Sequence, residues 1–248
     1  MRDTAPTTTV WRPISAPSNY VLAVAQMQAH AKALAAGEAP EAVFYTQHEA
    51  VYTAGTSARD EDLLNPAGTP THRSGRGGQW TWHGPGQLVL WPVLDLNARQ
   101  RDVRAYINAL EGWMIDVLAC FSVQGVRRDG MPGIWVSRGD ISQPEQMDKI
   151  VAVGVRISKW VTMHGVALNH DPDLTQYDGI IPCGISKNGG KSRAADCNPD
   201  TAGNVSLEAG GVTSLADLGL MVSEAELEIA VKDCFPKWFG MGAGMGRG

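Results

Sequence analysis

A run of apolar, largely β-branched residues at 149–157 places the strongest constraint on how this 248-residue chain can fold. A nearly continuous apolar run of this length, without the period of a helix, predicts a strand that is buried on both faces. We therefore expect it to be a central strand of a sheet. Other strand-like runs occur at 42–46, 50–53, 79–83, 87–95, 133–137 and 159–169.

Two of these runs predict a local pairing. Only Gly84-Pro85-Gly86 separates 79–83 from 87–95, a spacing that is typical of two strands joined by a tight turn. We therefore expect these two strands to pair with each other.

Three segments have the pattern of helices. Apolar residues recur at spacings of three and four through 102–122, which gives the clearest prediction. A second helix is expected between Ser18, as its N-terminal cap, and Gly37, which follows its last turn. Ser223-Glu224-Ala225-Glu226 is a capping box that opens a third helix. Strands and helices together predict an α/β (α+β) fold with a mixed sheet, flanking helices and a small C-terminal helical part.

The composition of the chain divides it into regions. We expect an N-terminal arm at 1–16, a main domain at 17–211 and a small helical part at 212–239. Within the main domain, Gly, Ser, Asn, Asp and Ala dominate 186–210, which predicts a flexible insertion. Glycine at every second position predicts that 240–248 lacks a fixed backbone.

Charge and targeting signals exclude several classes of function. The 26 acidic and 21 basic residues give a net charge of −5, which disfavours a nucleic-acid partner. No apolar run approaches the ~20 residues that a membrane helix needs. The polar start of the chain lacks the pattern of a signal peptide, so we expect a cytoplasmic protein without a membrane partner.

The sequence offers weak signals for a nucleotide or a metal ion. Gly189-Gly190-Lys191-Ser192 lacks the earlier glycine at the spacing of a phosphate-binding loop. The spacings among His164, His170, Cys183 and Cys197 match no usual zinc pattern. We therefore expect neither a phosphate-binding loop nor a metal site.

Cys183 is a candidate nucleophile. It ends the apolar run 180–183 and precedes Gly184, an arrangement that exposes a side chain in surroundings of low polarity. A thiol with a pKa of about 8.5 needs a nearby cation or proton acceptor to react well at pH 7. Lys149, at the start of the most apolar strand, could supply this cation. From these residues alone, a buried structural cysteine and a lysine at a strand end are also consistent readings.

A third cluster lies at 76–87. Its glycines leave backbone N–H groups accessible, and strand alternation places Gln79, Thr81 and His83 opposite Trp80 and Trp82. Such a polar face could hold a carbonyl group. A hairpin with an exposed polar face fits the same pattern.

Four segments, in this order and at this spacing, resemble the lipoyl(octanoyl) transferases, and 48–55 adds to the likeness. They are Arg-Gly-Gly-Gln-Trp-Thr-Trp-His-Gly-Pro-Gly-Gln at 76–87, Lys-Ile-Val-Ala-Val-Gly at 149–154, Thr-Met-His-Gly-Val-Ala-Leu-Asn at 162–169 and Ile-Pro-Cys-Gly at 181–184. The resemblance implies a biotin/lipoate protein ligase-like fold. It also implies transfer of an octanoyl group from acyl carrier protein to a lysine on the lipoyl domains of 2-oxoacid dehydrogenases or on the glycine-cleavage H protein.

The resemblance also implies roles for individual residues. Cys183 would carry the acyl group as a thioester, and Lys149 would lower the pKa of that thiol. A thioester exchange keeps the acyl group activated, so no cofactor is implied. His83 and His164 are expected near the reacting carbonyl, as are the amides of Gly165 or Gly184. The implied substrate-binding residues are Arg76, Gly77, Gly78, Gln79, Trp80, Thr81, Trp82, His83, Ala152, Val153, Gly154, His164, Gly165, Val166 and Ala167.

Two departures from the family pattern bear on these expectations. Trp82 stands where tyrosine is common, which predicts a changed pocket wall, and the insertion separates Cys183 from the segment that begins at Gly211. Since the chain is acidic, we expect Arg59, Arg73 and Arg76 to form the docking surface for an acidic carrier protein. An ATP-dependent lipoate or biotin ligase, or a non-catalytic module that binds these partners, are the alternatives.

Overall fold

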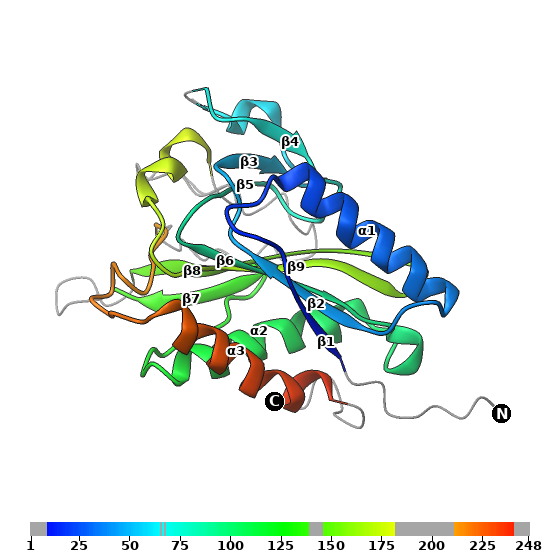
Figure 1. Cartoon of the computed structure of the whole chain (residues 1–248). Coiled ribbons are helices and arrows are strands. Elements are labelled where there is room, and N and C mark those ends of the chain that lie inside the picture. Colours follow the sequence, from blue (N-terminus) through cyan, green and yellow to red (C-terminus); the bar gives the residue numbers. More distant parts are fainter. Residues whose placement is uncertain (1–8, 65, 67, 139–145, 182–210, 241–248) are drawn as a thin grey trace.

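The computed structural model describes residues 9–64, 66, 68–138, 146–181 and 211–240, which form one six-stranded and one three-stranded sheet with three α-helices (Figure 1). Helix α1 (Tyr20–Ala36) covers one face of the larger sheet. Helices α2 (Val103–Ala119) and α3 (Glu224–Phe239) cover the other face. Each face of the sheet therefore has its own apolar core.

The larger sheet has the order β1-β2-β6-β9-β8-β7. Its strands are β1 (Val10–Pro13), β2 (Ala42–Thr46), β6 (Gln87–Val93), β7 (Gly133–Ser137), β8 (Met147–Ser158) and β9 (Val161–Asn169). Only β1 and β2 pair in parallel within this sheet. These strands place the predicted runs 133–137, 149–157 and 159–169 side by side.

The prediction that 149–157 lies inside a sheet is confirmed, because β8 lies between β9 and β7, but its predicted burial on both faces is wrong. β8 lies next to the edge strand β7, whereas β9 is buried at all nine of its positions. Residues 152–155 of β8 are only half-buried in spite of their apolar character. These four residues line a cavity, described below, and Ala152, Val153 and Val155 also flank the packed cores.

The predicted pairing of 79–83 with 87–95 is also wrong. The smaller sheet consists of β4 (Thr71–Arg73), β3 (Val51–Ala54) and β5 (Trp80–His83), so β5 pairs with β3 while β6 joins the larger sheet. The Gly86 carbonyl accepts hydrogen bonds from the N–H groups of His170 and Asp171, at 3.0 and 2.8 Å. These bonds hold the turn against the end of β9, and the chain crosses there from one sheet to the other.

The helix ends show one further difference. The α1 cap is Asn19, whose side chain accepts from the N–H groups of Val21 and Leu22, and not Ser18. Ser18 is buried instead, with its Oγ 2.8 Å from Nδ1 of His48. Gly37 ends the helix with a φ of +77°, and the predicted capping box at Ser223 and Glu226 is present.

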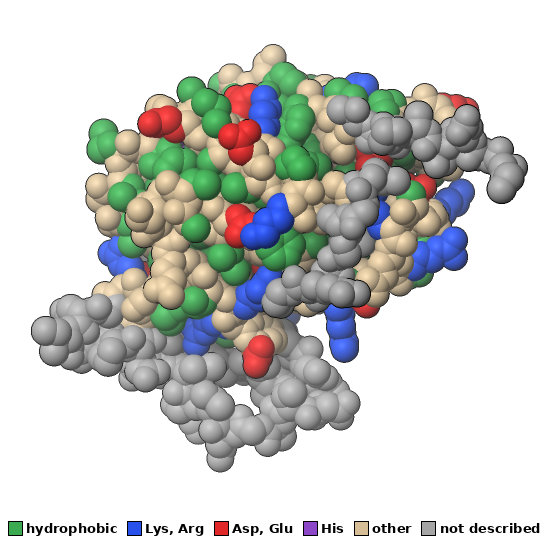
Figure 2. Space-filling model, turned by 90° about the horizontal axis from the view of Figure 1, so that it is seen from below, with side chains coloured by type: hydrophobic (Ala, Val, Ile, Leu, Met, Phe, Trp, Pro, Cys, Tyr) green, Lys and Arg blue, Asp and Glu red, His purple; other side chains and the backbone are tan. Residues whose placement is uncertain are grey.

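Short 3₁₀ turns at η1 (Asp60–Asp62), η2 (Leu96–Ala98) and η3 (Leu174–Gly179) complete the described elements. No helix in the described part is long and apolar enough to cross a membrane. On the face formed by α2 and α3, charged side chains of both signs lie among apolar ones (Figure 2). The predicted insertion at 186–210 and residues 241–248 of the tail lie outside the described residues, and the domain boundaries stay predictions.

Helices α2 and α3 pack closely through aromatic side chains. Trp113 of α2 donates from Nε1 to the Val231 carbonyl at 2.9 Å and packs edge-on against Phe235 and Phe239. Gly112 lies directly under the Trp238 ring, where a Cβ atom would have no room. The six-stranded sheet and both helices therefore share one apolar core.

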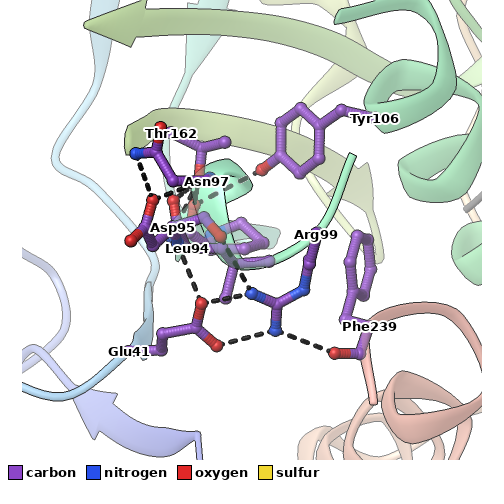
Figure 3. A network of polar contacts seen from close by, with 9 residues as sticks. Glu41, Leu94, Asp95, Asn97, Arg99, Tyr106, Thr162 and Phe239 are labelled. Carbon is purple, nitrogen blue, oxygen red and sulfur yellow. Dashed lines mark hydrogen bonds and ion pairs between the residues drawn. The ribbon is translucent and has the colours of Figure 1, made fainter. Parts of the chain in front are cut away.

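A buried ion pair fixes the end of α3 to the sheet (Figure 3). The Arg99 guanidinium binds both carboxylate oxygens of Glu41, with Nη2 2.7 Å from Oε2, and also donates to the Phe239 carbonyl at 2.9 Å. The Asp95 N–H donates to the same carboxylate at 2.9 Å. The start of β2, the turn η2 and the last residue of α3 thus share one polar network.

This network generates a stability prediction. Arg99→Met leaves the Glu41 carboxylate buried without its counter-ion, so we expect a loss of about 3–5 kcal/mol in the free energy of unfolding. Urea denaturation measures it. The matched control is Arg73→Met, because the Arg73–Asp60 pair is exposed and removing it costs roughly 0–1 kcal/mol. Equal losses in the two variants would contradict the importance of the buried pair.

Candidate active site

A cavity of about 230 Å³ lies between the β8–β9 pair, the 76–83 segment and α2. Apolar groups form most of its wall. Among the described residues for which the sequence implies substrate binding, Trp82 alone does not line it. The lining includes Arg76, Gly77, Gly78, Gln79, Trp80, Thr81, His83, Lys149, Ala152, Val153, Gly154, His164, Gly165, Val166 and Ala167. Cys183 lies outside the described residues.

Strand register brings the β8 and β9 segments together. Antiparallel pairing places Gly154 opposite Gly165, between the pairs Val153–Val166 and Val155–His164. The Gly77 N–H donates to the Val155 carbonyl at 2.8 Å, so the 76–78 loop lies on the open side of β8. A Cβ atom at position 154 would lie 3.1 Å from Cδ of Arg76 and 3.2 Å from the Gly77 carbonyl. The missing side chain therefore makes room for this loop.

Arg76 places a buried positive charge in the cavity wall. Its side chain is 7% exposed, and Nη2 donates to both the carbonyl and the hydroxyl of Thr53 at 2.8 Å. Nη1 donates to the Gly77 carbonyl at 3.0 Å. These bonds fix the guanidinium between the smaller sheet and the glycine loop.

The burial of Arg76 corrects the predicted docking surface for a carrier protein. A buried guanidinium cannot form part of a surface that binds another protein. Arg73 and Arg59 are exposed, but they form ion pairs with Asp60 and Glu61. Acidic neighbours thus offset the charge of the two exposed arginines.

Three buried histidines cluster with Tyr20 and Trp91, and two of them, His83 and His164, line the cavity. His83 stacks on Tyr20 with 5.8 Å between ring centroids, and the rings of His48 and His164 pack against Trp91. Burial is the largest cause that lowers all three pKa values, to about 4 for His48, to about 3 for His164 and well below the usual range for His83. The three rings are therefore neutral at pH 7.

The hydrogen bonds of His83 assign its tautomer. Its Nδ1 lies 2.6 Å from Oε1 of Gln87, whose amide nitrogen is directed at Trp82 O, Asn169 Oδ1 and the Tyr177 hydroxyl. The proton therefore lies on Nδ1, and Nε2 carries a lone pair. His83 offers the cavity an acceptor in this arrangement. Nε2 of His164 has no hydrogen-bond partner among the described residues.

Lys149 lies at the edge of the cavity and is 8% exposed. Its Nζ donates to the Pro132 carbonyl at 3.0 Å and lies 4.7 Å from the centroid of the Trp135 ring. The backbone of Lys149 pairs with Gly211 and Thr213, next to β9. The chain that resumes after the insertion therefore supports the strand that carries this lysine.

Trp82 lies on the other side of β5. Its ring packs in a separate apolar cluster and meets Tyr177 edge-on at 5.9 Å. The tryptophan at this position therefore fills the space between the smaller sheet and η3, not the wall of the cavity.

Comparisons with known proteins show to which family the chain belongs. The Lipoyl protein ligase A/B catalytic domain matches residues 19–225. Octanoyltransferases of Hyphomonas neptunium and Jannaschia sp. are each 46% identical to the chain, covering 92% and 93% of it and 89% and 98% of their own lengths. The octanoyltransferase of Parvibaculum lavamentivorans is 47% identical over 94% of the chain and 93% of its own length.

The chain belongs to the octanoyltransferase family. The three relatives are 46–47% identical to the chain over nearly the whole length of both proteins, which shows the family. The resemblance found in the four sequence segments is thereby confirmed.

Solved structures confirm the fold expected for an octanoyltransferase. A bipartite lipoate protein ligase from Thermoplasma acidophilum superposes with a TM-score of 0.67 at 14% identity, over 93% of this chain and 84% of that one. Lipoate-protein ligase A bound with ATP gives a TM-score of 0.64 at 15% identity, over 92% and 84%. The chain therefore has the α+β fold of the lipoate protein ligases.

Several residues that line the cavity were not predicted from the sequence. Tyr20, Trp91 and Ile107 come from α1, β6 and α2, where apolar residues at helical or strand spacing have the pattern of ordinary core positions. Nothing local distinguishes them. The alternation along β8 is the one signal that could have added Val155. The remaining missed residues are Val89, Gly130, Met131 and Pro132.

The buried histidines predict how stability depends on pH. The unfolded chain binds protons on His48 and His164 below pH 6.5, whereas the folded chain does so only near pH 4 and pH 3. Stability is therefore complete above pH 6.5 and falls as the pH drops toward 4. Each histidine contributes up to about 1.4 kcal/mol per pH unit within this window.

Urea denaturation between pH 7.5 and 5 measures this effect. We expect His48→Gln to lose less stability on acidification than the wild type, because one of the three buried histidines no longer takes up a proton on unfolding. The same dependence on pH in both proteins would contradict a buried neutral His48.

Proposed function

We propose that this octanoyltransferase moves an octanoyl group from octanoyl-acyl carrier protein to a lysine of a lipoyl domain, through a thioester on Cys183. The observation that carries the proposal is the apolar cavity, with Lys149 at its edge and polar groups of 76–83 along one wall. Family membership supports octanoyl as the acyl group. The cavity wall supports a substrate with an apolar chain and one polar end.

The first step exchanges one thioester for another. The Cys183 thiolate attacks the carbonyl carbon of the donor thioester, a bond to Cys183 sulfur forms, and the carrier's thiolate leaves with the electron pair of the broken C–S bond. We propose that the Lys149 ammonium favours the thiolate form of Cys183. The acyl group remains activated throughout, so the step consumes no ATP.

The second step forms the amide. The amine of the target lysine attacks the octanoyl carbonyl, the bond to Cys183 breaks, and the amine gives up a proton. The carrier's thiolate takes a proton from the Lys149 ammonium as it leaves in the first step, so Lys149 is neutral when the amine attacks. We propose that Lys149 then accepts the proton of the amine as the general base. The carbonyl oxygen becomes anionic in both steps, so donors around it lower the barrier, and the N–H groups near Gly165 are our candidates.

Burial of the acyl chain supplies the binding energy. An octanoyl group carries six methylenes and a methyl, and transfer of each from water is worth about 0.8 kcal/mol, or roughly 6 kcal/mol in total. The half-buried side chains of 152–155 are the apolar surface that this chain would cover.

The proposed acceptors are the lipoyl domains of 2-oxoacid dehydrogenases and the glycine-cleavage H protein, and the proposed compartment is the cytoplasm. No nucleic acid or membrane takes part in the proposed reaction.

Intact-protein mass spectrometry tests the covalent step. Incubation with octanoyl-acyl carrier protein should add one octanoyl group, which hydroxylamine removes, because a thioester is more labile than an amide. Cys183→Ser should form no such adduct, and Lys149→Ala should form it at least tenfold more slowly. The matched control is Cys120→Ser, which should react at the wild-type rate.

The other possible results discriminate the alternatives. An ATP-dependent ligase would leave no thioester on the wild type, and its Cys183→Ser variant would still modify lipoyl domains when given ATP and free octanoate. A binding module would retain the carrier protein without any adduct. Either result removes the proposed mechanism.

The role proposed for Lys149 predicts a shift in the reactivity of Cys183 with pH. If the ammonium favours the thiolate, alkylation of Cys183 by iodoacetamide should saturate at a lower pH in the wild type than in Lys149→Ala. Rates measured from pH 5 to pH 10, with the modified peptide identified by mass, provide the comparison. Identical profiles would remove this role from Lys149.

A further inference from the structure

Helix α2 carries a buried carboxylate, Glu111, on the opposite side of the Pro132–Gly133 peptide from Lys149. Glu111 is 6% exposed and lies among the apolar residues that α2 directs at the sheet. Burial raises the pKa of its carboxyl group, and the N–H of Gly133 and the Arg127 guanidinium oppose that shift. A buried charge costs free energy unless it is paired and hydrogen-bonded, and the contacts of Glu111 supply both.

One peptide group joins Glu111 to Lys149. The Gly133 N–H donates to Oε1 of Glu111 at 2.9 Å, and the carbonyl of the same peptide, on Pro132, accepts from Nζ of Lys149 at 3.0 Å. The peptide plane is rigid, so its N–H and its C=O move together. A carboxylate on one side and an ammonium on the other also polarise the group in the same direction, which strengthens both hydrogen bonds.

Gly133 makes this arrangement possible. Its φ of +123° is a conformation that glycine adopts without strain. A Cβ atom there would lie 3.2 Å from Cε and 3.5 Å from Nζ of Lys149. The peptide therefore lies directly against the lysine side chain and sets where its end can go.

We propose that Glu111 is a positioning residue for Lys149, which it holds at the cavity edge through the Pro132–Gly133 peptide. The proposal rests on the function proposed above for Lys149. Glu111 fixes the peptide, the peptide carbonyl fixes one N–H of the ammonium, and the Trp135 ring supports its other side.

The other charged groups around this relay are mostly basic, and the acidic one among them pairs with an arginine. Arg127, in the segment before β7, lies 3.3 Å from Oε2 of Glu111, and the Arg128 guanidinium lies 4.9 Å from the centroid of the Trp135 ring. Asp148, beside Lys149 on β8, faces Arg138 at 3.5 Å. Among the described residues, Glu111 is thus the acidic group that the peptide relay couples to Lys149.

Three variants separate positioning from charge and from folding. Glu111→Gln keeps an oxygen at the same reach for the Gly133 N–H, whereas Glu111→Asp keeps the charge but is one methylene too short. Glu111→Ala removes both. We expect Glu111→Gln to keep at least a third of the wild-type kcat, and Glu111→Asp and Glu111→Ala to lose tenfold or more, because misplacement by about 1 Å is worth up to a hundredfold. KM for the carrier protein should change little.

The pH profile of Cys183 alkylation gives the decisive readout, since a loss of folding stability alone does not move it. In Glu111→Asp the profile should shift toward that of Lys149→Ala, and in Glu111→Gln it should stay near the wild type. Wild-type profiles in both Glu111 variants, while Lys149→Ala is shifted, would overturn the inference alone. No shift in Lys149→Ala would overturn the proposed role of Lys149 and this inference with it.

Two cysteine thiols lie close together where α2 packs against α3. Sγ of Cys120, at the C-terminal end of α2, lies 3.8 Å from Sγ of Cys234 on α3. The helices are fixed at this point, because Asp116 accepts from Nε1 of Trp238 at 2.6 Å and pairs with Lys237 at 2.7 Å. Rotation about the side-chain bonds can therefore bring the sulfur atoms to bonding distance.

We infer that Cys120 and Cys234 form a redox-sensitive pair that a peroxide converts to a disulfide. Cys120 is exposed and meets the oxidant first, while Cys234 is half-buried. The Cys120 sulfur takes the distal oxygen of hydrogen peroxide to give a sulfenic acid, and water leaves. The Cys234 sulfur then attacks the sulfenic sulfur, the S–O bond breaks, and a second water leaves. Two thiols lose two electrons to one peroxide.

Peptide mapping after treatment with hydrogen peroxide tests this pair in a Cys183→Ser/Cys197→Ser background. We expect one cross-linked peptide containing Cys120 and Cys234, which dithiothreitol reverses, and a rise in Tm of about 5 °C or more, because the bond closes a loop of over a hundred residues. Cys120→Ser and Cys234→Ser should show neither effect. Both cysteines remaining open to alkylation, or Cys120 passing to sulfinic acid without a cross-link, would overturn the inference.

Discussion

The cavity depends on the antiparallel pairing of β8 with β9. That register places Gly154 beside Gly165, and the absence of a side chain at position 154 lets the 76–78 loop lie on the strand. The Gly77 N–H bonds to β8 rather than to the loop's own sheet. A shift of one residue would turn every side chain to the opposite face, so one pairing decides both the cavity wall and the position of the loop.

Electrostatics divide the cavity into two ends. Arg76 brings a guanidinium that backbone and hydroxyl oxygens fix in place, while the histidines nearby stay uncharged because they are buried. Lys149 lies at the other side, where a peptide carbonyl and an aromatic face hold its ammonium. The apolar residues of β8 separate these groups. Such a site suits a substrate with a long apolar part and a single reactive carbonyl.

Much of this could be predicted from local pattern. The three helices, the capping box at Ser223 and the strand runs follow from spacing, and the four segments with their family resemblance identified about two thirds of the described residues of the cavity wall. Local pattern failed where partners are distant in sequence. The 79–83 run pairs with β3 because Trp82 packs on Tyr177, and the turn at Gly86 is held by residues after β9. No signal within 79–95 contains those partners.

The sequence by itself determined the chemistry that is available: the order of the four segments, the glycines that permit close approach, and the identities of Lys149 and Cys183. Only the tertiary structure decided which faces those residues occupy. It placed residues 152–155 of β8 in the wall of a cavity, buried Arg76, and set Glu111 behind the peptide that holds Lys149. The physical reason is that burial and hydrogen bonding depend on what packs from other elements, and a side chain's own neighbours in sequence do not specify those contacts.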